Sequence, residues 1–420
     1  MRQVPAVTKP HKITFLTSIG AGLEYYDCVI YYLLASFISQ QFFPSSNHTA
    51  ALFATFSIFA ATNIIRPIGG TIFGMFGDRY GRKNVFANTL LLMAAATFGI
   101  GLVPPYAILG IVSTILFCLL LITQSVAFGA ELPGALTFLL EHTHSKNRGL
   151  HCGFMIAAVG LGVTLGSFVT YIITKLLSNK EMLEFGFRLP FFLGGILAIV
   201  GFFIRRRTAE TPSFLALKKP EKNALAELVK HYPLETLQCI LLILFPACLI
   251  TFFLGLPVYL HDYYNYKTSD IFLVLTCGYL WSALLLPLFG WVADKTNRKI
   301  MFFLALLCVL IFAPTIFALL SLKTKPALFC FVGIMQTLIA AMAANYFVLL
   351  PEVFPTKIRY TGTAFSYNIT YSIAALMPLT ANYVYQVVKN PNLLSVIFVA
   401  LASISAVCLL SLKKTHNQNI

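Results

Sequence analysis

A polar signature occurs twice in this otherwise apolar chain of 420 residues. Its spacing, G-x-x-x-D-[RK]-x-x-R-K, is found first in Gly74, Asp78, Arg79, Arg82 and Lys83. The second half repeats it in Gly290, Asp294, Lys295, Arg298 and Lys299. A glutamate and an arginine at matched spacing also recur, as Glu141 with Arg148 and as Glu352 with Arg359. Such recurrence predicts two copies of one membrane unit, the internal symmetry typical of secondary transporters.

The composition independently predicts that the chain lies in a membrane. Hydrophobic residues make up 58% of it and charged residues 11%, whereas soluble domains carry about 25% charged residues. Segments of about 20 apolar residues, long enough to cross a bilayer, can be placed a dozen times. We predict helices over residues 14–40, 51–76, 84–103, 107–140, 150–177, 186–204, 237–260, 270–292, 300–321, 327–350, 362–388 and 393–412.

The predicted fold is therefore all-α, with twelve transmembrane helices in two six-helix bundles related by internal pseudo-symmetry. We expect an N-terminal bundle at 1–204, a cytoplasmic linker at 205–236 and a C-terminal bundle at 237–420. Some helices contain residues that favour a break or bend, namely Pro246, Gly255, Pro257 and Pro287. A gate and an ordinary kink would both explain them.

The basic residues are placed where membrane topology requires them. The net charge is +15, and most of the 30 lysines and arginines fall in the predicted inner segments. The positive-inside rule then places both termini in the cytoplasm, and we expect no nucleic-acid partner. The first apolar segment lacks a small-residue cleavage site, so it is predicted to be a retained helix rather than a signal peptide.

No pattern in the sequence indicates an enzyme, a cofactor or a metal site. The nine cysteines lie in or near apolar segments and form no C-x-x-C pair. No H-E-x-x-H or comparable constellation occurs. We therefore expect neither a zinc site nor a disulfide framework.

Four ionisable residues are predicted near the middle of the membrane, namely Glu24, Asp27, Arg66 and Glu131. A charge at the bilayer centre costs about 2.5–3.5 kcal/mol, so these groups must face a cavity or a partner. We predict that Asp27, Glu131 and Glu24 take part in proton coupling. The alternative is a structural ion network in which Arg66 neutralises one carboxylate and holds the helices together.

Substrate-binding residues are expected at the same depth. Gly20, Glu24, Asp27 and Tyr31 share one helix face because they follow i, i+4, i+7, i+11 spacing. The second half offers polar and aromatic groups there, and aromatic rings can hold an ammonium group by cation–π attraction, although packing roles would also explain them. The predicted substrate-binding residues are Arg66, Tyr31, Gln124, Asn345, Tyr367, Asn368 and Tyr371.

The duplicated loops predict a cytoplasmic gate. An aspartate beside basic residues can bind a helix N-terminus and opposing arginines, which forms a latch that opens once per transport cycle. The residues predicted for this gate are Asp78, Arg79, Arg82, Asp294, Arg298, Glu141, Arg148, Glu352 and Arg359.

Longer motifs carry a resemblance to a known family. They are Gly22–Asp27, Arg66–Gly70 leading into Gly77–Arg82, Gly129–Glu131, Phe187–Phe191, Glu210–Phe214 and Glu352–Tyr360. In these motifs the chain resembles the major facilitator superfamily, and within it the metabolite:proton symporter branch that includes proline/betaine transporters. The resemblance implies the major facilitator fold, alternating access, and uptake of a small osmolyte or organic acid with protons.

The chain departs from that branch at positions that bear on substrate. Leu121 stands where members of the branch often carry a basic residue, and Ser125 replaces a glycine. A missing positive charge disfavours carboxylate-rich substrates. The residues after the last predicted helix lack the long heptad tail of osmosensing relatives, so osmotic activation is not expected.

We predict a monomeric proton symporter of the bacterial inner membrane that imports a zwitterionic osmolyte such as proline or glycine betaine. Its expected partners are the small-molecule substrate, protons and the lipid bilayer. A symporter of dicarboxylates or other organic acids is the first alternative. A drug efflux antiporter is another, since glycines in one helix resemble an exporter motif without its proline, namely Gly153, Gly160, Gly162 and Gly166. A membrane sensor without transport would have a similar sequence.

Overall fold

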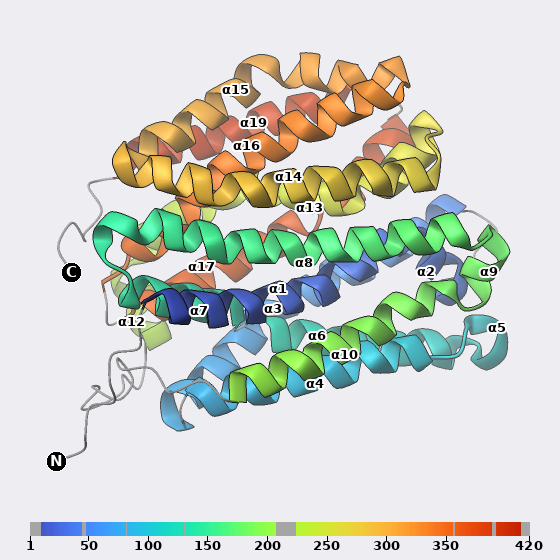
Figure 1. Ribbon diagram of the computed structural model, residues 1–420, viewed down its shortest axis with the longest axis horizontal. Coiled ribbons are helices and arrows are strands. Elements are labelled where there is room, and N and C mark those ends of the chain that lie inside the picture. Colours follow the sequence, from blue (N-terminus) through green and yellow to red (C-terminus); the bar gives the residue numbers. More distant parts are fainter. Residues whose placement is uncertain are drawn as a thin grey trace.

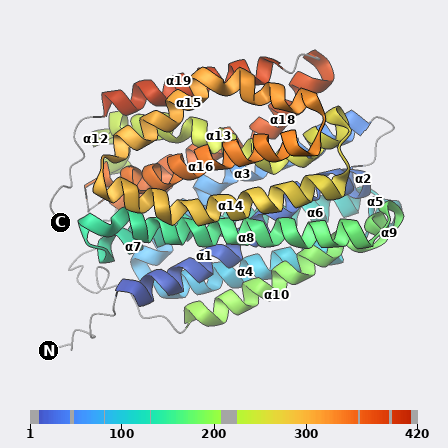
Figure 2. The same cartoon turned by 45° about the horizontal axis from the view of Figure 1, so that its top comes forward.

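The computed structural model describes residues 10–43, 48–80, 82–129, 131–206, 224–355, 358–388 and 392–412. Within these residues the chain is helical apart from short turns. The helices run lengthwise in two groups, one from α1 to α10 and the other from α13 to α19 (Figure 1). The same division is visible after rotation (Figure 2).

The first group accounts for the first six predicted spans. The prediction of one helix over 14–40 corresponds to two helices, and that over 107–140 corresponds to three. The observed bounds are α1 Pro10–Leu33, α2 Ala35–Phe42, α3 His48–Tyr80, α4 Arg82–Leu102, α5 Tyr106–Leu109, α6 Ile111–Phe128, α7 Glu131–His142, α8 Arg148–Leu176, α9 Asn179–Glu184 and α10 Leu189–Arg206.

The second group accounts for the other six spans. The short helix α12, Ala224–His231, precedes this group. The helices of the group are α13 Pro233–Tyr264, α14 Thr268–Lys295, α15 Arg298–Ala318, α16 Lys325–Glu352, α17 Arg359–Ala374, α18 Met377–Tyr383 and α19 Asn392–Ser411. A π-helical turn, Val384–Val388, follows α18. The helix α13 begins within the stretch expected to be linker, and linker residues 207–223 lie outside the described part.

Within the described part, nine helices are long and apolar enough to cross a membrane. The three remaining predicted spans correspond to α1, to α4, and to α17 with α18. The apolar described part of α4, Asn88–Leu102, is shorter than 18 residues, and α17 and α18 have 16 and 7 residues. Helix α1 contains both Glu24 and Asp27.

The prolines predicted to break or bend the seventh and eighth spans lie inside continuous helices. Helix α13 continues through Pro246 and Pro257, and α14 continues through Pro287. A break occurs instead between α17 and α18, because Pro378 has no amide hydrogen to donate to the carbonyl of Ala374. Gly255 of α13 packs there, and a Cβ at that position would lie 2.8 Å from the Pro378 Cβ.

The two groups meet along α8 and α14, which lie side by side in both views (Figures 1 and 2). Glycines allow the two backbones to approach closely, as in other membrane helix pairs. A Cβ on Gly153 would lie 2.7 Å from the Leu286 carbonyl oxygen. At Gly149 it would overlap the carbonyl oxygen of Gly290. A long seam of backbone contact therefore joins the halves.

Candidate functional site

A cavity of about 950 Å³ lies between the two groups of helices. Both halves line it, the first through α1, α3 and α8 and the second through α13, α14, α16 and α17. Among its described lining residues, Arg66 is the one with a formal charge. The aromatic lining residues are Tyr25, Tyr32, Phe253, Tyr279, Phe347, Tyr367 and Tyr371, and the polar ones include Asn63, Thr251, Ser282 and Gln336.

Arg66 extends from α3 and is 7% exposed. Its guanidinium carbon lies 4.6 Å from the centroid of the Phe128 ring on α6, which is a cation–π contact. Arg66 also lines a second, smaller cavity, so this residue borders both spaces.

Tyrosine hydroxyls connect the walls of the large cavity. The hydroxyl oxygens of Tyr25 on α1 and Tyr367 on α17 lie 2.9 Å apart, a hydrogen bond between the two halves. Those of Tyr346 and Tyr371 lie 3.3 Å apart. The rings of Tyr367 and Tyr371 are 4.4 Å apart between centroids, so they form one aromatic surface beside the space.

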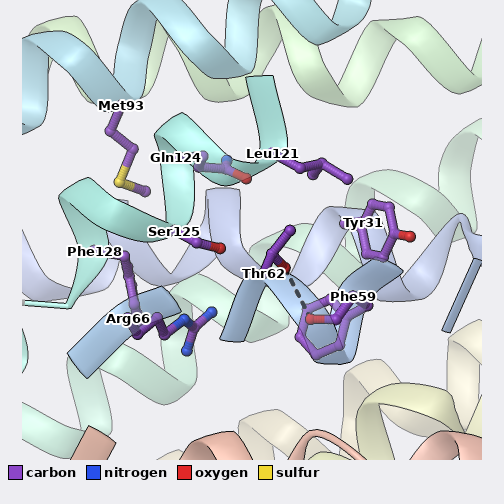
Figure 3. Close-up of a pocket in the computed structure, with 9 residues that line it drawn as sticks. All are labelled: Tyr31, Phe59, Thr62, Arg66, Met93, Leu121, Gln124, Ser125 and Phe128. Carbon is purple, nitrogen blue, oxygen red and sulfur yellow. Dashed lines mark hydrogen bonds between the residues drawn. The ribbon is translucent and has the colours of Figure 1, made fainter. Parts of the chain in front are cut away.

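The smaller cavity, of about 330 Å³, lies within the first group of helices. Figure 3 shows Arg66 and Thr62 extending from α3 and Gln124 and Ser125 from α6 toward this space. The Tyr31 ring borders it, but the hydroxyl points away and donates to the Thr55 carbonyl oxygen at 2.7 Å. The predicted substrate ligands Tyr31 and Gln124 therefore line this cavity and not the large one.

Asp27 is fully buried between α1, α4 and α10. The Thr97 hydroxyl on α4 donates to Asp27 Oδ2 at 3.4 Å. The Gln124 amide in turn donates to the Thr97 oxygen at 2.8 Å. Opposite them, a Cβ at Gly194 would overlap Asp27 Oδ1, so only glycine leaves room for the carboxyl group.

The other predicted carboxylates and amides are buried, and they do not line either cavity. Glu24 is 2% exposed on α1, and Glu131 is fully buried in the first turn of α7. The Asn368 amide donates to the Gly129 carbonyl oxygen at 2.8 Å and so ties α17 to the chain just before Glu131. Asn345 donates to the Ala341 carbonyl oxygen within its own helix at 2.7 Å.

A buried ion pair joins the halves at one end of the bundle, and a second basic residue shares its carboxylate. Arg148 at the start of α8 lies 3.0 Å from the Glu352 carboxylate at the end of α16. Arg298 lies 3.5 Å from the same carboxylate and 2.6 Å from Asp294. We call this cluster of Arg148, Asp294, Arg298 and Glu352 the ion-pair gate.

Asp294 of the ion-pair gate also caps a helix of the other half. Its two carboxylate oxygens accept the backbone amides of Gly149 and Leu150, each at 2.9 Å. A carboxylate at the N-terminus of α8 is stabilised by the helix dipole as well as by these bonds. Arg359, another residue predicted for the gate, donates to the carbonyl oxygens of Pro351 and Phe354.

The remaining predicted gate residues come from the first half. They are Asp78, Arg79, Arg82 and Glu141, whose side chains lie outside the described part. At the opposite end of the bundle, apolar residues join the halves. Val258 of α13 packs there against Ala35, Leu52 and Phe56.

Residues that the sequence analysis did not predict complete the site. Thr97 is the one polar side chain between Leu90 and Leu102, and that position is the one signal in the sequence that could have found it. Tyr25 follows Glu24 in the sequence but lies on a different face of α1. It shares that face with Val29 and Tyr32, and all three line the large cavity. Nothing in the sequence indicated Gly194, because its role depends on its contact with a neighbouring helix.

The sequence profile described as Major Facilitator Superfamily matches residues 14–378 of this chain. The chain belongs to the major facilitator superfamily. A glycine betaine/proline/ectoine/pipecolic acid transporter, OusA of Dickeya dadantii, is 30% identical, with 96% of this chain and 83% of that protein covered. A proline/betaine transporter of Salmonella typhimurium is 29% identical, with 98% and 85% covered.

Solved structures of the superfamily have the same fold. The proton:xylose symporter XylE bound to 6-bromo-6-deoxy-D-glucose superposes with a TM-score of 0.78 at 17% identity, covering 95% of this chain and 94% of that one. A partially occluded inward-open conformation of XylE from E. coli gives 0.75 at 16% identity, covering 98% and 99%. The predicted fold class, twelve helices in two bundles, is thus confirmed. This superfamily member is a multi-pass membrane transporter and not an enzyme.

Proposed function

We propose that this transporter imports a small zwitterionic osmolyte of the proline or glycine betaine type, together with protons. The observation that carries the proposal is the large cavity, in which Arg66 is the charged group among the described lining residues and aromatic rings form much of the wall. The curated relatives named above, which carry proline or betaine in their names, support the same substrate class.

The two kinds of group suit the two ends of a zwitterion. A guanidinium binds a carboxylate through charge-assisted hydrogen bonds, in a geometry that a single arginine can provide. Aromatic rings attract a quaternary or secondary ammonium by cation–π interaction, at about 2 kcal/mol or more when water is excluded. A dicarboxylate would need a second cationic partner, so the lining favours a zwitterion over the organic-acid alternative.

Asp27 and Glu131 are the proposed proton-carrying groups, with Glu24 as a buried neighbour. Both are fully buried carboxyl groups in the first bundle, on α1 and on α7. A buried carboxyl group is costly to ionise, so the gain or loss of a proton strongly changes the free energy of the group at its site. A membrane potential supplies about 2.3 kcal/mol per charge per 100 mV, enough to drive accumulation without a separate energy-coupling domain.

Alternating access would arise from rocking of the bundles at 1–204 and 237–420 about the linker at 205–236. In this proposal the ion-pair gate is the cytoplasmic latch, both termini are cytoplasmic, and the membrane is a bacterial inner membrane. The Arg148–Glu352 ion pair, which joins α8 to α16, must separate before substrate can leave toward the cytoplasm. The bacterial origin of the named relatives supports the location.

The test is uptake of labelled proline into proteoliposomes under an imposed inward proton gradient. We expect accumulation that glycine betaine suppresses, that 2-oxoglutarate leaves unchanged, and that a protonophore abolishes. Asp27→Asn should abolish accumulation but retain exchange of proline across the membrane, because substrate binding needs no charge there. Uptake of 2-oxoglutarate without uptake of proline would overturn the substrate proposal and leave the fold intact.

A further inference from the structure

Two side chains link the buried carboxyl group of Asp27 to the smaller cavity. Gln124 lines that cavity, donates to Thr97 at 2.8 Å, and Thr97 donates to Asp27 Oδ2 at 3.4 Å. We infer that Thr97 and Gln124 are positioning residues that connect the proton site at Asp27 to the smaller cavity, while substrate occupies the large one. This inference rests on the proposed function.

The order of donors makes this relay selective for one protonation state. The amide hydrogen of Gln124 points to the Thr97 oxygen, so the threonine hydroxyl hydrogen is turned toward Asp27. A hydroxyl that donates to a carboxylate favours its ionised form. The donors of a hydrogen-bond chain also polarise one another in a low-dielectric interior. The relay therefore stabilises Asp27 after it has released its proton.

The other carboxyl oxygen, Oδ1, is the one that would carry the proton. Oδ1 is buried and has no hydrogen-bond partner among the residues that the structure describes. It rests beside Gly194, where the missing side chain leaves space. Buried polar atoms are normally bonded, and each exception needs an explanation. In our proposal, the carboxylate of Asp27 takes up one proton on Oδ1 and becomes neutral, and no other group changes its charge.

The surroundings of Asp27 contain few other titratable groups. Glu24 and Tyr26 are its titratable neighbours on α1. The facing helices α4 and α10 present Thr97 and Gly194, which do not titrate. Arg66 of α3 lines the smaller cavity with Gln124. Helix α7, which packs against α1, carries Glu131 in its first turn.

The two cavities share Arg66 and otherwise have separate described linings. A substrate carboxylate that binds Arg66 from the large cavity would change the electrostatic field in the smaller one. Substrate and proton would thus influence each other through Arg66, without contact between them. The relay would couple the charge state of Asp27 to the smaller cavity rather than to the space that holds the substrate.

The first variant to measure is Thr97→Val, which removes the hydroxyl group and nearly preserves the shape. We expect the pH of half-maximal proline uptake to rise by about one unit, since the lost donor no longer favours the ionised carboxyl. Thr97→Ser should restore the wild-type profile. Thr170→Val is the matched control, because that buried hydroxyl on α8 donates within its own helix to Gly166 at 2.8 Å.

The second variant, Gln124→Leu, tests the relay if Thr97→Val fails to fold. It should move the pH profile in the same direction by a smaller amount. Both variants should keep the wild-type affinity for proline in counterflow at equal pH on the two sides, because neither residue lines the large cavity. A fall in counterflow affinity for Gln124→Leu would assign this glutamine to substrate binding and overturn its place in the relay.

The outcomes separate the inference from the proposed function. If wild-type uptake is proton-driven and Thr97→Val lowers its rate without moving the pH profile, the relay is wrong and the symport stands. If wild-type uptake does not respond to a proton gradient, the proposed function fails and the relay fails with it. Size-exclusion profiles of each purified variant identify a loss caused by misfolding.

Discussion

The hydroxyl groups of Tyr25 and Tyr367 lie 2.9 Å apart and join the two halves of the transporter across the large cavity. Their helices, α1 and α17, belong to different bundles, so the bond must break whenever the bundles separate at this level. This hydrogen bond lies where it can couple substrate binding in the cavity to the relative position of the two halves.

Removing either hydroxyl should weaken this link by about 1 kcal/mol, the typical net value of a hydrogen bond. We expect Tyr25→Phe and Tyr367→Phe each to change the KM for proline up to about fivefold. The double variant should match either single variant, because all three lose the same bond. Uptake kinetics in proteoliposomes measure this. Additive effects would mean that the hydroxyls act through different partners.

Arg66 should determine affinity for the carboxylate end of the substrate. Arg66→Gln removes the charge that lines both cavities, and hydrogen bonds to charged groups contribute about 1.5–3 kcal/mol. We expect KM to rise about 10- to 100-fold, with a smaller rise for Arg66→Lys because lysine keeps the charge but loses the planar fork. Choline, which has an ammonium group but no carboxylate, is the control competitor. It should inhibit proline uptake weakly and to the same extent in the wild type and the variant.

Breaking the ion-pair gate should open one end of the bundle. Glu352→Gln leaves Arg148 and Arg298 without their shared carboxylate, and removing one partner of a buried pair costs about 3–5 kcal/mol. We expect a lower Tm and faster alkylation of Cys152, a buried thiol on α8 near this cluster. Peptide mapping by mass spectrometry measures the alkylation, with buried Cys239 of α13 as the internal reference.

The conservative variant Glu352→Asp keeps a carboxylate on a shorter side chain. It should lose less stability and leave Cys152 protected. Alkylation of Cys152 that is equally slow in wild type and Glu352→Gln would show that these pairs do not hold the gate closed.

The seam between α8 and α14 should tolerate no added side chain at Gly153. An alanine there would place its Cβ 2.7 Å from the Leu286 carbonyl oxygen, and overpacking of this kind costs about 1–3 kcal/mol. We expect Gly153→Ala to lower the Tm measured in detergent. Gly333→Ala is the matched control on α16, because no atom lies within 4 Å of its added Cβ. Equal Tm values for both variants would contradict close packing at the seam.

The sequence by itself determined the architecture of this protein. An apolar segment long enough to cross a bilayer must form a helix there, and the duplicated motifs show that the two halves are related. The duplicated motifs also singled out Asp294, Arg298, Arg148 and Glu352, which the structure brings together in one cluster of ion pairs. Their role as a gate stays a prediction.

Only the tertiary structure decided which polar residue faces which space. A helix face can be read from spacing, but whether it faces a cavity or a neighbouring helix depends on rotation and packing. Asp27 therefore faces Thr97 and Gly194, whereas Tyr25 faces the large cavity. The break before Pro378 arose likewise, since neighbouring helices decide whether a proline is accommodated within a continuous helix or ends it.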